Sequence, residues 1–152
     1  MDHELFRQTV KAIDERYCPF EKAILTNNCD CSRAQRFCIA ERDGLHCGDS
    51  AAQARCVELL ARLRGQARFA LRTPNEHAAL PHAKAMRVQV GGLRGLHAAL
   101  HPQQSAPRRI ADIDHLVRAA LAQFGSLANL PFGVLIQQIA AYRGRRPLRT
   151  RN

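Results

Sequence analysis

The chain has 152 residues, of which 46% are hydrophobic, so it can bury about one hydrophobic core and not two. Aromatic residues make up only 5% and Trp is absent, so packing must depend on aliphatic side chains, which suits helices better than a sheet sandwich. The formal net charge is +10, and every basic residue except Lys11, Lys22 and Lys84 is arginine. The first sixteen residues lack the apolar stretch of a secretory signal, and no window approaches eighteen consecutive apolar residues. We therefore expect a cytoplasmic protein without a membrane span.

The N-terminal third is predicted to form short helices separated by loops that carry cysteines. Apolar side chains recur every three or four residues over 5–17, which predicts an amphipathic helix ended before Pro19. Residues 20–25 are expected to form another turn or two, and 27–31 a polar loop. Ser32 is expected to cap a helix that runs to about Arg42 and stops at Gly44.

The longest predicted helix covers 51–72, with Asp49 or Ser50 as its cap and Thr73-Pro74 as its end. The predicted inner stripe of this helix consists of Cys56, Leu60, Leu63, Ala67 and Leu71. Beyond it, apolar and polar residues alternate over 86–90, which predicts an extended segment. Gly91-Gly92 then indicates a hinge or a close approach between backbones.

Three further helices are predicted in the C-terminal part, over 93–100, 110–124 and from Pro131 to about Tyr142. Arginines dominate residues 143–152, and the lack of apolar periodicity there predicts a disordered basic tail. The sequence thus predicts an all-α single domain of about five to seven helices over 1–142, with a cysteine-rich cluster-binding region at 18–56.

All six cysteines of the chain lie between Cys18 and Cys56. In a reducing compartment, such a cluster of thiols indicates a metal or iron–sulphur centre before it indicates disulfides. Loops and helix ends supply ligands from several directions, so we predict as ligands Cys18, Cys31, Cys47 and Cys56, with Cys29 as a possible substitute. Cys38 is expected to be a small buried hydrophobe on its helix. Nearby arginines and the N–H groups of helix starts are expected to favour the thiolate forms.

The spacing of the cysteines favours an iron–sulphur cluster over zinc. Structural zinc sites usually contain two C-x2-4-C hooks, and this chain has only the closer pair Cys29 and Cys31. Single cysteines follow at wide intervals, which resembles a four-cysteine cluster site, 4Fe-4S in particular, although no standard ferredoxin spacing is present. Zinc, disulfides and free thiols remain as alternatives. His46 is a further candidate ligand or hydrogen-bond donor, and otherwise an exposed loop residue.

Other chemistry finds little support in the sequence. His97 and His101 stand four residues apart on a predicted helix, but no third ligand accompanies them nearby in the sequence. No hydrolytic triad signature or phosphate-binding loop is present, so an enzyme is the less favoured interpretation.

The first functional hypothesis is a small iron–sulphur protein that transfers electrons or serves as an accessory subunit of a redox enzyme. Its positive charge would attract an acidic redox protein or an acidic face of that enzyme. The alternative is a zinc- or cluster-binding regulatory protein whose basic tail contacts nucleic acid. No nucleic-acid-binding motif accompanies the charge, so this alternative has weaker support.

Overall fold

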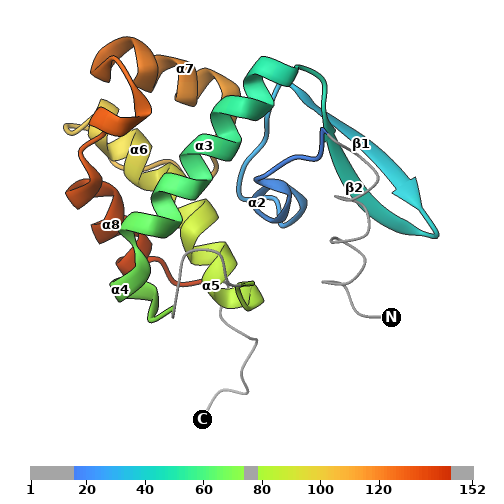
Figure 1. Cartoon of the computed structure of the whole chain (residues 1–152), viewed down its shortest axis with the longest axis horizontal. Helices are drawn as coiled ribbons and strands as arrows, with labels where there is room; N and C mark the ends of the chain where they lie inside the picture. The colour runs from blue at the N-terminus through green and yellow to red at the C-terminus, as the bar shows by residue number, and fades with distance from the viewer. Residues whose placement is uncertain (1–15, 74–78, 145–152) are drawn as a thin grey trace.

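The computed structural model describes residues 16–73 and 79–144, and these residues are mostly helical with one small two-stranded sheet (Figure 1). The prediction of a helical fold is confirmed in this coarser form, whereas the sheet is a feature that the sequence analysis missed. None of the helices within the described ranges is long and apolar enough to cross a membrane.

In chain order the elements are α2 (Glu21–Leu25), β1 (Ala34–Ile39), β2 (Arg42–Cys47), α3 (Ser50–Gln66), α4 (Arg68–Leu71), α5 (His82–Met86), a π-helical segment (Arg87–Gly91), α6 (Gly92–Leu100), α7 (Ile113–Phe124), a 3-10 turn (Leu127–Asn129) and α8 (Phe132–Ala141). In Figure 1 the helices α3 to α8 form one body, and the two strands project from the side on which α2 lies.

Helix α3 crosses the front of the helical body in Figure 1. The side chain of Asp49 accepts a hydrogen bond from the N–H of Ala51 and so caps the helix, as predicted. The inner stripe is also confirmed in outline, because Leu63, Ala67 and Leu71 are buried. The predicted helix over 51–72 is nevertheless divided at Ala67, which separates α3 from the single turn of α4.

Residues 82–100 form one continuous helical run, so the extended segment predicted at 86–90 is wrong. Alternating apolar and polar residues predicted a strand with one buried face. In the structure Val88, Gln89 and Val90 are all buried and belong to a π-helical turn. The Oε1 of the buried Gln89 is satisfied by a hydrogen bond of 3.0 Å from the N–H of Ala23. This bond attaches α2 to the centre of the helical body.

Glycines allow this helical run to lie against α8 at very short range. An ideal Cβ on Gly91 would stand 2.8 Å from the Cα of Ile139, and one on Gly95 would stand 2.6 Å from the Cα of Leu135. Both distances are too short for real atoms, so only glycine fits at these two positions. The close approach between backbones that the sequence indicated at Gly91-Gly92 is thereby confirmed.

The predicted helix from Ser32 to Arg42 is wrong, because this stretch belongs to an antiparallel hairpin of β1 and β2. The two turn residues, Ala40 and Glu41, have φ values of 52° and 66°. Such turns usually contain Asn or Gly, so the sequence offers no recognisable turn signal here. Gly44 is not a helix stop: it lies opposite Phe37, whose ring occupies the space that a Cβ would need.

The chain before α2 pairs with the hairpin. The N–H of Cys18 donates to the carbonyl of Leu45 at 3.1 Å, and Tyr17 forms a bridge with His46. The helix predicted over 5–17 otherwise falls outside the described residues, as does most of the predicted tail at 143–152.

The three predicted C-terminal helices are present, although α7 begins at Ile113 and not at Ile110, which forms a backbone bridge with Cys29. Asp112 caps α7 through a hydrogen bond from the N–H of Asp114, and α7 ends at Gly125, where φ is 86°. Helix α8 begins at Phe132, one residue later than predicted, and Pro131 immediately precedes it.

Substitution of Gly95 by alanine should destabilise the protein by about 1–3 kcal/mol, because the added methyl group collides with the backbone of α8. Urea unfolding followed by circular dichroism measures this change. Gly133→Ala is the matched control. This substitution also replaces a helical glycine by alanine, but the added Cβ meets nothing within 4 Å. That control should leave stability unchanged or raise it by up to about 1 kcal/mol. Equal effects of the two substitutions would contradict the close packing of α6 on α8.

Candidate metal centre

The four cysteines predicted as ligands line one small cavity, which we call the four-cysteine cavity. They come from four separate segments: Cys18 precedes α2, Cys31 lies in the loop before β1, Cys47 ends β2, and Cys56 is in α3. The other lining residues are Pro19, Phe20, Arg33, Ala34, Ala52, Gln53, Ile113 and Asp114. Residues separated by almost one hundred positions in the chain therefore meet at this point.

The remaining candidate residues do not line this cavity. Cys29 is fully buried and lies beside Ile110, with which it forms a short backbone bridge. Cys38 is exposed on β1, so its predicted role as a buried hydrophobe is wrong. His46 is half-buried on β2 and not in a free loop. The ring centroids of His97 and His101 lie 4.8 Å apart at the C-terminal end of α6.

Backbone N–H groups point at two of the sulphurs. The N–H of Phe20 donates to the Cys18 sulphur, and the Cys31 sulphur receives the N–H groups of Arg33 and Asp114. In the sequences Cys-Pro-Phe and Cys-Ser-Arg the donor lies two residues after the cysteine, so a tight turn suffices to make this contact. Such N–H groups stabilise negative charge on sulphur, as clusters and thiolate metals require.

In the protein without metal, burial nevertheless keeps these thiols protonated. Desolvation raises the pKa of Cys18 and Cys31 and raises that of Cys56 to about 12, with smaller contributions from the neighbouring thiols and carboxylates. The expectation that nearby arginines make the sulphurs anionic is therefore wrong for these three residues. Withdrawal from water outweighs the hydrogen bonds and charges that would favour thiolates.

The carboxylate of Asp114 organises the charged groups at the edge of the cavity. Its side chain is only 2% exposed, and it forms ion pairs with Arg33 at 3.4 Å, Arg55 at 3.2 Å and Arg118 at 3.1 Å. Three guanidinium groups share this one carboxylate, and Arg33 also lies 4.0 Å from the carboxylate of Asp49. Asp114 also lies in the first turn of α7, where the helix dipole favours a negative side chain.

The sequence analysis missed the contribution of α7 to this site. Ile113 and Asp114 line the cavity, and Asp112 accepts a hydrogen bond of 2.9 Å from the N–H of Ser32. An aspartate at a helix start is a general capping signal. Nothing in the sequence connects it with cysteines some eighty residues earlier.

The cavity itself has a volume of about 20 Å³, which is room for about one water molecule. No three His, Cys, Asp or Glu side chains in the described part of the chain are arranged to hold a single metal ion. The thiols therefore gather without forming a finished site for one ion. A core of several atoms needs more room than this cavity has.

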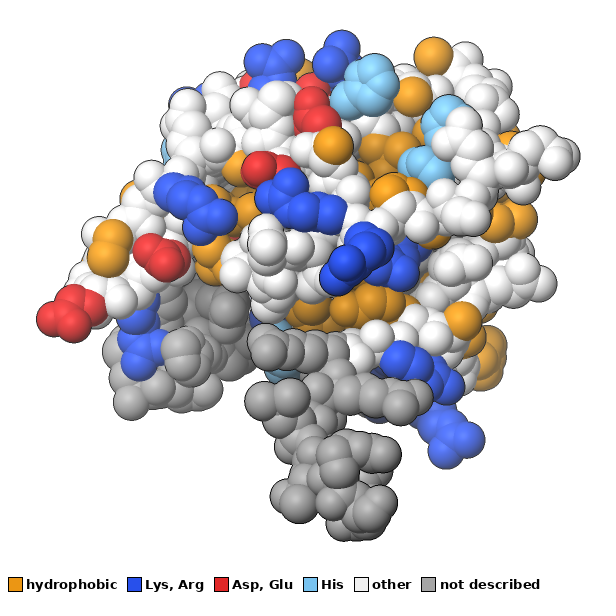
Figure 2. Space-filling model, turned by 180° about the vertical axis from the view of Figure 1, so that it is seen from behind, with side chains coloured by type: hydrophobic (Ala, Val, Ile, Leu, Met, Phe, Trp, Pro, Cys, Tyr) orange, Lys and Arg blue, Asp and Glu red, His pale blue; other side chains and the backbone are white. Residues whose placement is uncertain are grey.

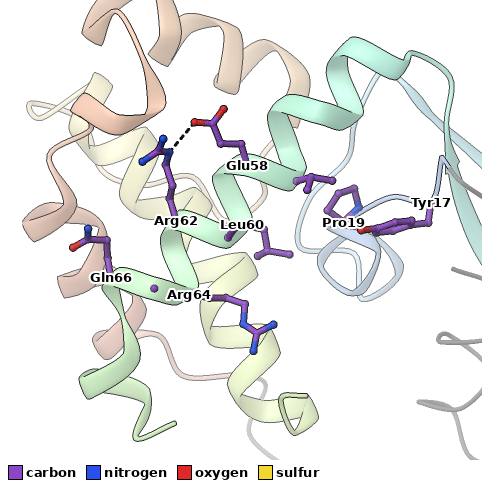
Figure 3. A pocket seen from close by; sticks show the side chains of 10 residues that line it. Tyr17, Pro19, Glu58, Leu60, Arg62, Arg64 and Gln66 are labelled. Carbon is purple, nitrogen blue, oxygen red and sulfur yellow. Dashed lines mark hydrogen bonds and ion pairs between the residues drawn. The ribbon is translucent and has the colours of Figure 1, made fainter. Parts of the chain in front are cut away.

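A surface groove lies next to this cavity along α3 (Figure 3). Tyr17 and Pro19, the two neighbours of Cys18, form one side of it, and α3 forms the other. On the α3 side, Glu58 and Arg62 are joined by an ion pair of 2.7 Å. We call this surface the α3 groove.

The chain matches no known protein family, no curated protein and no solved structure. The arrangement of its own residues is therefore the basis for any functional conclusion.

Substitution of Asp114 by asparagine should lower the free energy of unfolding by about 2–4 kcal/mol, because removal of a buried charge leaves its arginine partners unneutralised. Chemical denaturation of the two proteins measures the difference. Glu58→Gln is the control: it removes an exposed partner of Arg62, and its effect should stay within about 0.5 kcal/mol. A similarly small effect of Asp114→Asn would show that the buried carboxylate does not hold these segments together.

The metal-free protein should lose stability as the pH rises above 9.0, the ordinary pKa of a cysteine thiol. Burial raises the pKa of Cys29 and Cys56 to about 12, so the folded chain keeps protons that the unfolded chain releases. The folded state then binds more protons, and the free energy of unfolding falls with pH. This contribution is fully present below pH 9.0 and is lost toward pH 12.

Urea unfolding of chelator-treated protein at several pH values measures this loss. Cys56→Ser removes one of the thiols whose pKa burial raises and should show a shallower decline. A decline of equal steepness in both proteins would contradict the assignment to Cys56.

Proposed function

We propose that the protein binds an iron–sulphur cluster, 4Fe-4S in particular, and acts in electron transfer or as an accessory subunit of a redox enzyme. The observation that carries this proposal is the convergence of four cysteines from four separate segments on one apolar cavity. Four thiolates are the usual protein ligands of such clusters. Cys18, Cys31, Cys47 and Cys56 would be those ligands.

The spacing of the cysteines favours a cluster over a zinc ion, because the chain lacks the second C-x2-4-C hook that structural zinc sites usually contain. N–H groups reach the sulphurs of Cys18 and Cys31, and such hydrogen bonds tune the potential of a cluster.

When bound, the cluster would supply one-electron redox chemistry. The protein would contribute a water-poor lining, N–H donors to sulphur and the positive charge of the arginines around Asp114. Cations beside an anionic core stabilise its more reduced, more negative state, so Arg33, Arg55 and Arg118 would raise the reduction potential. Cys47 would exchange its present hydrogen bond to the Asp49 carbonyl for a bond to iron.

The surroundings of the cavity support an acidic redox partner. Cys18, Cys31 and Cys56 are partly exposed, so a cluster there would lie close to the surface. Arg33 and Arg118 are well exposed at the same edge, with 44% and 53% of their side chains accessible. The α3 groove provides a concave surface next to Cys18, and the net charge of +10 attracts an acidic protein over longer distances.

Serine in place of Cys18, Cys31, Cys47 or Cys56 should abolish or severely reduce cluster binding, because each substitution removes one ligand. Protein purified or reconstituted without oxygen is assayed for iron, for acid-labile sulphide and for absorption near about 400 nm. Cys38→Ser is the matched control: the thiol is exposed on β1, and its loss should leave the iron content unchanged.

Two outcomes would overturn the proposal. If the purified protein is colourless and contains stoichiometric zinc, the site binds zinc and not a cluster, which favours a structural or regulatory role. Full iron and sulphide content in the Cys47→Ser protein would show that the four-cysteine cavity is not the binding site.

A further inference from the structure

A second concave surface lies between α2, α5, α6 and the end of α8, and we call it the basic groove. Its volume is about 1060 Å³, slightly above the range of about 300–1,000 Å³ that is typical of small-molecule sites. It is lined by Leu25, Thr26, Asn27, Asn28, His82, Ala83, Met86, Arg87, Arg94, Gln138, Ala141, Tyr142, Arg143 and Gly144. None of the residues of the four-cysteine cavity contributes to it.

The lining contains three arginines and no carboxylate. Among the residues that the structure describes, Arg87, Arg94 and Arg143 form no ion pair with Asp or Glu. By contrast, Arg33, Arg55 and Arg118 on another part of the surface share the carboxylate of Asp114. The basic groove is thus a local concentration of positive charge that no carboxylate within 16–73 or 79–144 neutralises through an ion pair.

Neutral carbonyl groups hold these arginines in place. Arg87 donates to the carbonyls of Ile139 and Ala140 at 3.2 Å each, at the end of α8. Arg143 donates to the carbonyl of Ala140 at 3.0 Å, and Arg94 donates to the carbonyl of Arg108 at 3.2 Å. These bonds fix the guanidinium groups but leave their full charge and several N–H donors available. Fixed guanidinium groups suit the geometry of phosphate oxygens.

An aromatic ring lies beside this charge. The guanidinium carbon of Arg94 stands 5.7 Å from the centre of the Tyr142 ring, which orients both side chains. Desolvation raises the pKa of Tyr142, so its hydroxyl stays protonated and can donate a hydrogen bond. On the face opposite to that of Figure 1, Lys and Arg side chains border exposed apolar atoms (Figure 2).

We propose that the basic groove binds the phosphate group of a small anionic molecule. Arg94 and Arg143 would contact the phosphate oxygens, and Asn27, Asn28 and Gln138 offer amide groups to the rest of the molecule. The groove is concave and of small-molecule size, which favours a phosphorylated metabolite over a nucleic acid backbone. An anion there would also relieve the repulsion among the three arginines.

Isothermal titration calorimetry on the full chain at low ionic strength tests this proposal with three probes: inorganic phosphate, adenosine monophosphate and citrate. One molecule of phosphate or of the monophosphate should bind per chain, and added salt should weaken the binding. Arg94→Gln and Arg143→Gln should each weaken it about tenfold or more, since each removes a charged hydrogen-bond donor. Similar binding of both phosphates would assign the site to free phosphate, and tighter binding of the monophosphate would assign it to a phosphomonoester.

Two matched controls separate this site from general attraction to positive charge. Arg62→Gln removes an exposed arginine of α3, far from the groove lining, and should leave the affinity unchanged. The full-length variant with glutamine at Arg145, Arg146, Arg149 and Arg151 tests the basic C-terminal residues in the same way. Circular dichroism spectra and melting temperatures like those of the parent protein show that each variant is folded.

Several results would overturn the proposal. In the first, neither phosphate nor adenosine monophosphate binds to the parent protein. In the second, the phosphate affinity is unchanged in the folded Arg94→Gln and Arg143→Gln variants. In the third, phosphate binding is lost when the C-terminal arginines are replaced by glutamine. Citrate that binds more tightly than either phosphate would also overturn it, as would binding of single-stranded oligonucleotides alone.

Discussion

The buried carboxylate of Asp114 is the interaction on which the candidate site depends. It lies at the start of α7, and its ion pairs reach Arg33 before the hairpin and Arg55 in α3. Its own N–H is shared between the Asp112 carboxylate, at 3.2 Å, and the sulphur of Cys31, while Asp112 also accepts the N–H of Ser32. One helix end therefore fixes the loop that carries Cys31 and the helix that carries Cys56. Cys18 is joined separately to the strand that ends in Cys47, through its N–H bond to the Leu45 carbonyl.

The charges of the protein fall into two arrangements with different consequences. Around Asp114 three arginines share one buried carboxylate, so the charge there is partly neutralised and the groups hold the fold together. In the basic groove Arg87, Arg94 and Arg143 bond only to carbonyl oxygens, so their charge stays available to a ligand. The described arginines thus differ in whether a carboxylate neutralises them.

The pKa values of the thiols bear on the proposed cluster. Burial favours protonated thiols at Cys18, Cys31 and Cys56, and the proposed cluster would displace these protons on binding. The N–H groups of Phe20, Arg33 and Asp114 then stabilise the negative charge that remains on sulphur. The lining therefore suits thiolates only when a bound metal cation offsets their negative charge. Binding should accordingly strengthen as the pH rises.

The sequence by itself determined the helical class, the cap at Asp49 and the choice of four cysteines that line one cavity. Local signals suffice for the first two, because capping and apolar periodicity act within a few residues, and the crowding of all six thiols into 18–56 indicated the third. The tertiary structure alone decided the hairpin, whose turn at Ala40 and Glu41 carries no Gly or Asn, and the π-helical turn, whose Gln89 is buried through a distant partner. It also decided the pKa of the thiols, since desolvation depends on which segments cover them. Contacts such as that between Asp114 and Cys31 join residues far apart in the chain, and no local pattern encodes them.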